Sequence, residues 1–260
     1  MMADLPLPVF LITDFGESDT YVGQMRAAMM RVAGPGVPMA DLTHAVPRGD
    51  VEQGLFHIGS ALPWLPRPSV VLAVVDPGVG GPRRPVAVRA GRVWLVGPDN
   101  GLLVPERAEE ARLLPVPEGS SATFHGRDVF APAAASIAAD PSWAGGLPGL
   151  DTAGLVRLAP CGSRKTGRGV SAAVAHVDRF GNVLLWLRRE DLPAGEPLLA
   201  RLPDGSKREL TRTDHYSGGR GLLILEGSQG LMELAVDGGS AAEETGLRPG
   251  DRVEIRMEPE

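Results

Sequence analysis

Apolar runs that end in aspartate alternate with amphipathic segments along the first half of the chain, and this alternation constrains the fold most. Residues 8–14 (PVFLITD) and 69–76 (SVVLAVVD) are continuous apolar runs, typical of buried parallel strands. In DTYVGQMRAAMMRVAGPG, apolar residues recur at helical spacing before a Gly-Pro-Gly stop. Helices are also expected over 50–63, with Asp50 as N-cap, and 128–139, and strands over 86–90 and 93–97. The pattern predicts an α/β domain with a mainly parallel sheet.

The second half of the chain has a different pattern. Residues 140–169 are rich in Gly, Pro and small residues, and we interpret them as a linker. After them, short apolar segments alternate with turn signals such as Pro-Asp-Gly, which predicts a small all-β barrel or sandwich. We therefore expect two domains, an α/β domain over 1–160 and a barrel-like β domain over 168–260.

Composition excludes several classes of protein. The chain has 260 residues, 43% of them apolar and 22% charged, which is enough apolar material for a buried core. The net charge of −6 offers no basic surface for nucleic acid. No apolar run reaches the roughly 18 residues of a membrane span, and the first residues lack the basic region of a signal peptide. A single cysteine, Cys161, fits a reducing compartment, so we expect a cytoplasmic protein without nucleic-acid or membrane partners.

The two strand-end aspartates are the first candidates for a site. Ligands of open α/β sheets bind outside the carboxyl ends of the strands. Asp14 and Asp76 are each followed within two residues by glycine, which allows close backbone approach, although one such Asp alone is more often a cap. The loop DPGVGGPRR (76–84) lacks both the Walker A and the dinucleotide-binding patterns, so phosphate binding has little support.

The other candidate residues have ordinary structural interpretations. None of the five histidines forms an HxH or HxxxH pair, so a histidine-based zinc site has little support, and no GxSxG elbow indicates a hydrolase triad. His44 and His125 suit either a site or a structural hydrogen bond. PDNG (98–101) is typical of a hairpin turn. DRFGN (178–182) resembles a tight turn, in which an aromatic residue is less expected. These residues support an α/β enzyme with an acidic, glycine-lined pocket but do not give the reaction.

Seven blocks taken together resemble one family. They are LITDFGESDTYVGQM, DLTHAVPRGDV, VVDPGVGGPRRPVAV, GPDNGLL, TFHGRDVFAPAAA, HVDRFGN and GSQGLMELAV. In this order, from about residue 10 to 255, they resemble the S-adenosyl-L-methionine hydroxide adenosyltransferase family, which is related to the fluorinase and chlorinase. The resemblance implies hydrolysis of S-adenosyl-L-methionine (SAM) to adenosine and L-methionine, with water attacking the ribose C5′. It also implies that Asp76, Arg83 and His125 surround that water.

The resemblance also assigns the substrate-binding residues. Asp14 matches the carboxylate on the two ribose hydroxyls, Asp178 the group facing the methionine ammonium, and Ser228 a donor to the methionine carboxylate. Phe180 and Asn182 match residues at the adenine, which backbone near Val236 completes. The family binds substrate between the amino-terminal domain of one subunit and the carboxy-terminal domain of another, usually in a trimer. A homotrimer is therefore implied, and we separately expect no metal or cofactor requirement.

Departures from the related enzymes favour hydrolysis. The halogenases carry Tyr where this chain has Asp76, and the fluorinase carries Ser at the position of Gly126. A carboxylate would repel halide in a desolvated site.

Trp186 and Gln229 depart from the family pattern on the adenine side. The alternatives are a halide-dependent, chlorinase-like adenosyl transferase, a non-catalytic adenosine- or SAM-binding protein, and a metal-dependent phosphoesterase.

Overall fold

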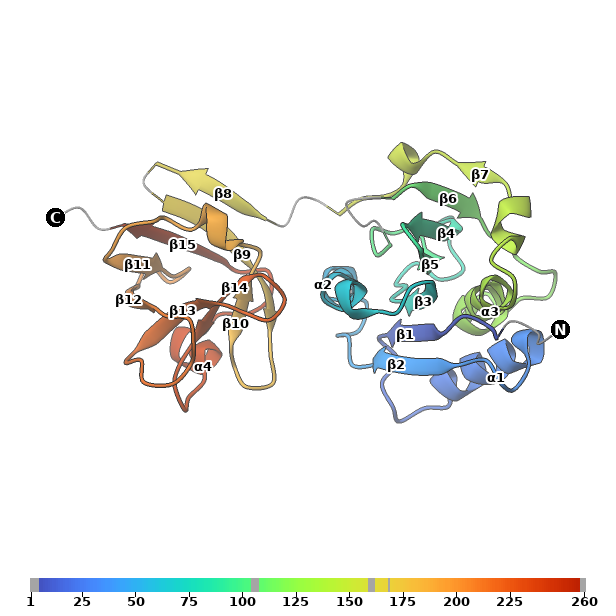
Figure 1. Ribbon diagram of the computed structural model, residues 1–260, viewed down its shortest axis with the longest axis horizontal. Coiled ribbons are helices and arrows are strands. Elements are labelled where there is room, and N and C mark those ends of the chain that lie inside the picture. Colours follow the sequence, from blue (N-terminus) through green and yellow to red (C-terminus); the bar gives the residue numbers. More distant parts are fainter. Residues whose placement is uncertain (1–4, 104–107, 159–161, 168, 258–260) are drawn as a thin grey trace. The chain divides into compact units, whose positions relative to one another are not determined.

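The computed structural model describes residues 5–103, 108–158, 162–167 and 169–257 (Figure 1). The chain divides into two compact units, Met1–Leu158 and Ala159–Glu260. Within the described residues, the helices are too short or too polar to cross a lipid bilayer.

The first unit contains a seven-stranded sheet with helices on both faces. Its strands follow the order β2-β1-β3-β5-β4-β6-β7. The four strands β2, β1, β3 and β5 are mutually parallel, and β6, which is antiparallel to β4, runs in their direction too. Five of the seven strands therefore share one direction, which confirms the predicted α/β domain with a mainly parallel sheet. The strands are β1 (Val9–Thr13), β2 (Met39–Thr43), β3 (Ser69–Val74), β4 (Pro85–Ala90), β5 (Val93–Pro98), β6 (Glu110–Leu113) and β7 (Gly149–Leu150).

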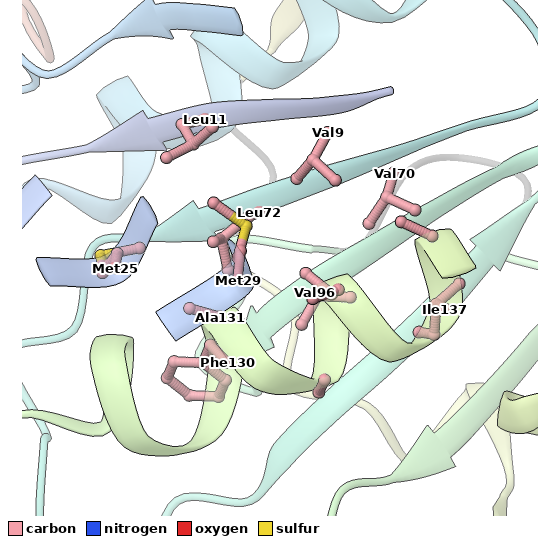
Figure 2. Close-up of a cluster of buried hydrophobic side chains, with 14 of the residues drawn as sticks. Val9, Leu11, Met25, Met29, Val70, Leu72, Val96, Phe130, Ala131 and Ile137 are labelled. Atoms are coloured by element: carbon pink, nitrogen blue, oxygen red, sulfur yellow. The ribbon is translucent and has the colours of Figure 1, made fainter. Parts of the chain in front are cut away.

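Alternating strand residues supply the two cores of this unit. On one face, Leu11, Leu72 and Val96 pack against α1 (Tyr21–Ala33) and α3 (Ala131–Ala139) (Figure 2). On the other face, the intervening strand residues pack with Ile58 of α2 (Val51–Ala61). Each fully buried Leu, Ile or Met contributes about 1.5–3 kcal/mol. The result is a three-layer unit whose central strands are buried on both sides, as their continuous apolar sequences predict.

The helices begin where the sequence predicts, with one exception. Asp50 caps α2 by accepting from the backbone N–H of Gln53 at 3.0 Å. The third predicted helix instead begins with a π-helical turn, η2 (Gly126–Phe130), and continues as α3. In this turn the N–H of Ala131 donates to the carbonyl of Gly126, five residues earlier. Such single π turns are frequent at functional sites, and His125 directly precedes this one.

Two expectations for irregular segments are wrong. Much of the predicted linker belongs to the first unit, where it forms η3 (Trp143–Gly146), β7 and η4 (Thr152–Gly154), and β7 pairs with β6. These elements are two to four residues long, so they have no periodicity that a sequence could reveal. The PDNG segment is not a hairpin turn, because the antiparallel partner of β5 is β4, which precedes it in the chain.

The second unit is a closed barrel. Seven strands follow the order β9-β10-β14-β13-β12-β11-β15 and return to β9, and β8 is added outside on β9. Only the β12–β13 pair within this closed circuit is parallel. The barrel-like β domain is therefore confirmed. Its elements are β8 (Ser163–Thr166), β9 (Gly169–Val177), β10 (Val183–Leu185), η5 (Arg189–Asp191), β11 (Leu198–Arg201), β12 (Lys207–Arg212), β13 (Leu222–Glu226), β14 (Met232–Ala235), α4 (Ala241–Thr245) and β15 (Arg252–Met257).

Candidate functional site

The carboxyl ends of the parallel strands deliver polar side chains to one edge of the sheet. Asp14 follows β1, His44 follows β2, Asp76 lies two residues after β3, and Asp99 follows β5. Parallel neighbours end at the same edge, where α/β proteins bind ligands. A cavity of about 1020 Å³ lies there and is lined by Asp14, Asp76 and His125, among others.

Asp76, Arg83 and His125 meet at this cavity. The Arg83 Nε lies 3.1 and 3.0 Å from the two carboxylate oxygens of Asp76, and its Nη2 lies 2.5 Å from Oδ2. The same Nη2 lies 2.8 Å from Nδ1 of His125. The structure thus joins three residues that are up to 49 positions apart into one hydrogen-bonded chain, with the arginine in the centre.

This cluster is largely removed from water. The side chains of Arg83 and Asp76 are 9% and 4% exposed, and the guanidinium lies 5.1 Å from the ring centroid of Phe130. Burial, followed by the positive charge of Arg83, lowers the pKa of His125 below its ordinary value, although Asp76 and Asp128 act in the opposite direction. The imidazole is therefore neutral at neutral pH. Removing one member of a buried ion pair leaves the other uncompensated, so the two charges depend on each other.

A glycine allows the two loops of this cluster to touch. Gly80 lies in the loop between Asp76 and Arg83, with a φ of +75°. A Cβ there would lie 2.3 Å from the carbonyl oxygen of Ala122, in the loop before His125. Gly80 thus allows two backbone segments to approach closely, whereas an added Cβ on Gly16 or Gly78, the glycines that follow Asp14 and Asp76, would have no neighbour closer than 3.5 Å.

Asp14 lines the same cavity and is held by a backbone contact. Its Oδ2 accepts from the backbone N–H of Gly49 at 2.7 Å. Just before it, Thr13 is fully buried, and its hydroxyl lies 2.8 Å from Nδ1 of His44. The carbonyl of His44 accepts from Gly16 at 2.8 Å, so His44 has the structural role that its sequence allowed. Together these contacts hold the turn that carries Asp14.

In the second unit, Asp178 organises its own loop. Its Oδ1 accepts from the backbone N–H groups of Phe180 and Asn182, each at 2.9 Å. Its Oδ2 accepts from the Asn182 amide at 3.0 Å. The turn predicted for DRFGN is present, and the side chains of its aspartate and asparagine form a hydrogen bond with each other. Phe180, by contrast, is 76% exposed.

The remaining predicted binding residues of the second unit lie on loops. A Cβ on Gly181 would be 2.1 Å from the hydroxyl of Ser240, so the DRFGN turn packs against the segment that follows Val236. Val236 is half-buried directly after β14. Ser228 is exposed in the turn between β13 and β14. The structure therefore brings Phe180, Asn182 and the end of β14 to neighbouring loops of one unit.

Two pairs of polar residues are among those that sequence reasoning missed. Asn100 donates to the carbonyl of Val75, next to Asp76, and Asp99 pairs with Arg84, next to Arg83, but their sequence is that of an ordinary turn. In the barrel, Tyr216 donates to the buried carboxylate of Glu233. Burial raises the pKa of Tyr216 to about 12 and also raises that of Glu233. A single polar residue within the apolar run LMELAV was the available signal for Glu233.

Metal-ligating side chains do not cluster in the described part of the chain. Within it, no group of three or more His, Cys, Asp or Glu residues is arranged to hold a metal ion. At the cavity, the carboxylate of Asp76 is engaged by a guanidinium rather than by a second carboxylate.

Comparisons with known proteins agree on one family. The model of the SAM hydroxide adenosyltransferase N-terminal domain matches residues 9–145, and that of the C-terminal domain matches residues 172–254. A protein named (R)-S-adenosyl-L-methionine hydrolase from Salinispora tropica is 38% identical over 96% of this chain and 98% of its own. One of the same name from Thermus thermophilus is 39% identical over 95% and 99%. A fluorinase from an Actinoplanes species is 26% identical over 72% and 73%.

A solved structure agrees as well. An uncharacterized conserved protein from Thermotoga maritima superposes with a TM-score of 0.84 at 28% identity, over 96% of this chain and all of that one. Both family models lie in the predicted order and together span most of the sequence. The chain belongs to the SAM hydroxide adenosyltransferase family.

Proposed function

We propose that this chain is a hydrolase that converts SAM and water into adenosine, L-methionine and a proton. The observation that carries the proposal is the buried Asp76–Arg83–His125 chain at the strand-end cavity. It occurs in a sequence that is 38% identical, over nearly its full length, to a protein named as such a hydrolase.

The chemistry suits these three residues. The sulfonium leaves as a neutral thioether and needs no acid, so the enzyme's task is to hold a water in line with C5′. Water oxygen bonds to C5′ as the C5′–S bond breaks, and the water gives up one proton. The carboxylate of Asp76, which Arg83 holds in place, accepts that proton. His125 orients the water as a hydrogen-bond donor.

Each unit carries residues that we assign to substrate binding. Asp14, in the cavity, suits the ribose diol because its two oxygens can accept from two hydroxyls. In the barrel, Phe180 and Asn182 are assigned to adenine with the backbone near Val236, Asp178 to the methionine ammonium, and Ser228 to the carboxylate. The exposed ring of Phe180 supports this, because it is available for stacking.

The setting of the reaction is also part of the proposal. We propose a cytoplasmic homotrimer that requires no metal or cofactor and contacts neither nucleic acid nor membrane. The single Cys161 supports a reducing compartment. Light scattering on the purified chain measures the mass of the assembly, and a monomer or dimer would contradict the trimer.

The test is product analysis with the purified full chain. The (R) and (S) sulfonium epimers of SAM are incubated separately, without halide and with a chelator, and products are separated by chromatography. We expect adenosine and methionine, faster from the (R) epimer named for the relatives. Asp76→Asn should slow the reaction about 10²–10⁴-fold. Asp140→Asn, an exposed carboxylate after α3, is the matched control and should have no effect.

Three other outcomes would each contradict this proposal. A halogenated adenosine formed with chloride would identify a chlorinase-like transferase. Adenosine binding without any product would identify a binding protein. Activity that the chelator abolishes would identify a metal-dependent enzyme.

A further inference from the structure

The turn after β5 connects the two segments that carry the charged pair of the site. We propose that Asp99 and Asn100 are positioning residues for hydrolysis, with Asp99 fixing the segment of Arg83 and Asn100 fixing the segment of Asp76. The inference rests on the proposed function, because it assigns both residues to the geometry of that reaction. Neither Asp99 nor Asn100 is among the described residues that line the cavity, so both act through their neighbours.

Asp99 is a buried carboxylate with all its contacts inside the protein. Its side chain is 2% exposed. Its Oδ2 accepts from Arg84 Nε at 2.8 Å and from Nη2 at 2.5 Å, and its Oδ1 accepts from the N–H of Val156 at 2.8 Å. Arg84 Nη2 also donates to the carbonyl of Gly154 at 2.6 Å. The carboxylate of Asp99 thus connects Arg84 with the segment that follows η4.

These contacts extend the sheet up to the residue beside Arg83. The β4–β5 ladder ends at the pair Pro85 and Pro98. One more backbone hydrogen bond follows, in which the N–H of Asp99 donates to the carbonyl of Arg84 at 2.9 Å. Arg83 is the first residue beyond this bond. Because its guanidinium must reach both Asp76 and His125, a shift of its backbone would break one contact or the other.

Asn100 fixes the other member of the pair. Its Nδ2 donates to the carbonyl of Val75 at 2.8 Å, and its Oδ1 accepts from the N–H of Leu102 at 3.2 Å. Val75 directly precedes Asp76, at the point where β3 has ended and the ladder no longer holds the chain. The side-chain amide offers the donor and the acceptor that these two contacts need. A carboxylate in its place would face the Val75 carbonyl without a donor.

The experiment uses two nearly isosteric substitutions in the full chain, Asp99→Asn and Asn100→Asp. Each should lower kcat about 10–10²-fold, as expected for a small displacement of reacting groups. KM for SAM should change less than about threefold, because binding contacts are kept. Glu110→Gln is the matched control: this carboxylate, like that of Asp99, accepts from arginine side chains, here Arg89 and Arg112, but it joins β4 to β6 and is not among the residues that line the cavity. It should leave kcat unchanged.

A double-mutant cycle separates positioning from general stabilisation. If Asp99 acts through Arg83, then Asp99→Asn costs no further activity once Arg83→Ala is present. Arg84→Lys gives a second, milder probe if Asp99→Asn does not fold, because lysine keeps the charge but lacks the planar fork. It should lower kcat in the same direction and also lose its effect beside Arg83→Ala.

The outcomes distinguish this inference from the proposed function. The inference would be overturned if Asn100→Asp had the wild-type kcat and either Asp99→Asn or Arg84→Lys had it too. It would also be overturned if the loss of activity in Asp99→Asn or Arg84→Lys added fully to the loss in Arg83→Ala. Neither result would affect the proposed function. Wild-type activity of Asp76→Asn would instead overturn the proposed function itself.

Discussion

Nη2 of Arg83 lies 2.8 Å from Nδ1 of His125, and this contact determines which ring nitrogen carries the proton. A guanidinium only donates hydrogen bonds, so Nδ1 must accept. The neutral imidazole then carries its hydrogen on Nε2 and offers a donor to the cavity that it lines. Because Nδ1 of His125 is engaged by Arg83 and Nε2 carries the hydrogen, the role of proton acceptor is left to Asp76.

The pH dependence of hydrolysis should follow from this contact. Protonation of His125 would turn Nδ1 into a donor facing Arg83, so activity requires the neutral ring. Because burial and Arg83 lower the pKa of His125 from 6.5, kcat/KM should stay constant on acidification until pH falls through that lowered value. An acid limb with its midpoint at or above 6.5 would contradict this. The measurement is a pH–rate profile from about pH 5 to 8.

The lowered pKa of His125 also predicts how the free energy of unfolding changes with pH. The unfolded chain has an ordinary histidine, so below pH 6.5 it binds more protons than the folded chain. This group therefore lowers the free energy of unfolding as pH falls. Circular dichroism at each pH of the profile shows whether lost activity reflects unfolding.

Asp14→Asn should weaken adenosine binding and leave the fold intact. The amide oxygen can keep the contact to the N–H of Gly49, but the charge that accepts from the ribose diol is lost. Hydrogen bonds to charged groups contribute about 1.5–3 kcal/mol, so Kd should rise about 10–10²-fold by calorimetry. Asp50→Asn, which keeps the cap of α2, is the control and should bind normally. Equal affinities in the two variants would remove Asp14 from the ribose site.

Phe180→Ala should weaken substrate binding without lowering the melting temperature. The ring is 76% exposed, so the barrel does not depend on it. Aromatic stacking contributes about 0.5–1.5 kcal/mol, which corresponds to a roughly 2–10-fold rise in KM. Trp64→Ala is a matched control, because this ring is also 76% exposed but lies on η1 (Leu62–Trp64) in the first unit. A rise in KM for both variants alike would point to a non-specific effect.

Two glycine-to-alanine substitutions, one in a central strand and one in a helix, test the packing of the first unit. In Gly97→Ala, the new Cβ would lie 2.1 Å from the carbonyl oxygen of Ala73, so β5 and β3 must separate next to the site. The free energy of unfolding should fall by at least about 1–3 kcal/mol in thermal melts. In Gly59→Ala, no heavy atom lies within 4 Å of the new Cβ, and the residue is inside α2. That variant should gain about 0.5–1 kcal/mol, and a loss there would show that the packing is misassigned.

The sequence predicted the elements whose signals are local. The apolar runs over 8–14 and 69–76 are strands because both of their faces are buried, and Asp50 caps its helix through a residue three positions away. Turn signals at regular spacing were enough to predict the β domain. Each of these features depends on neighbours within a few residues, so the pattern of the sequence carries it.

Features that depend on distant partners were missed. Asn100 was interpreted as a hairpin residue from its local PDNG pattern. Its actual acceptor, the carbonyl of Val75, lies 25 residues away, where no local pattern can indicate it. The short strand β7 has no pattern of its own and is defined by its pairing with β6. His125 was joined to Asp76 and Arg83 only through the family resemblance, since they are dozens of residues apart and no spacing rule relates them. The structure supplies that juxtaposition independently.

The most direct test of the proposed hydrolysis is the fate of the water oxygen. SAM is incubated with the purified chain in ¹⁸O-labelled water without halide, and the products are weighed by mass spectrometry. Attack of water on C5′ predicts adenosine that carries one ¹⁸O atom at the 5′ position and unlabelled methionine, with Asp76→Asn strongly slowed. Cleavage of a different sulfur–carbon bond, giving methylthioadenosine with labelled homoserine, or adenosine without the label would contradict it.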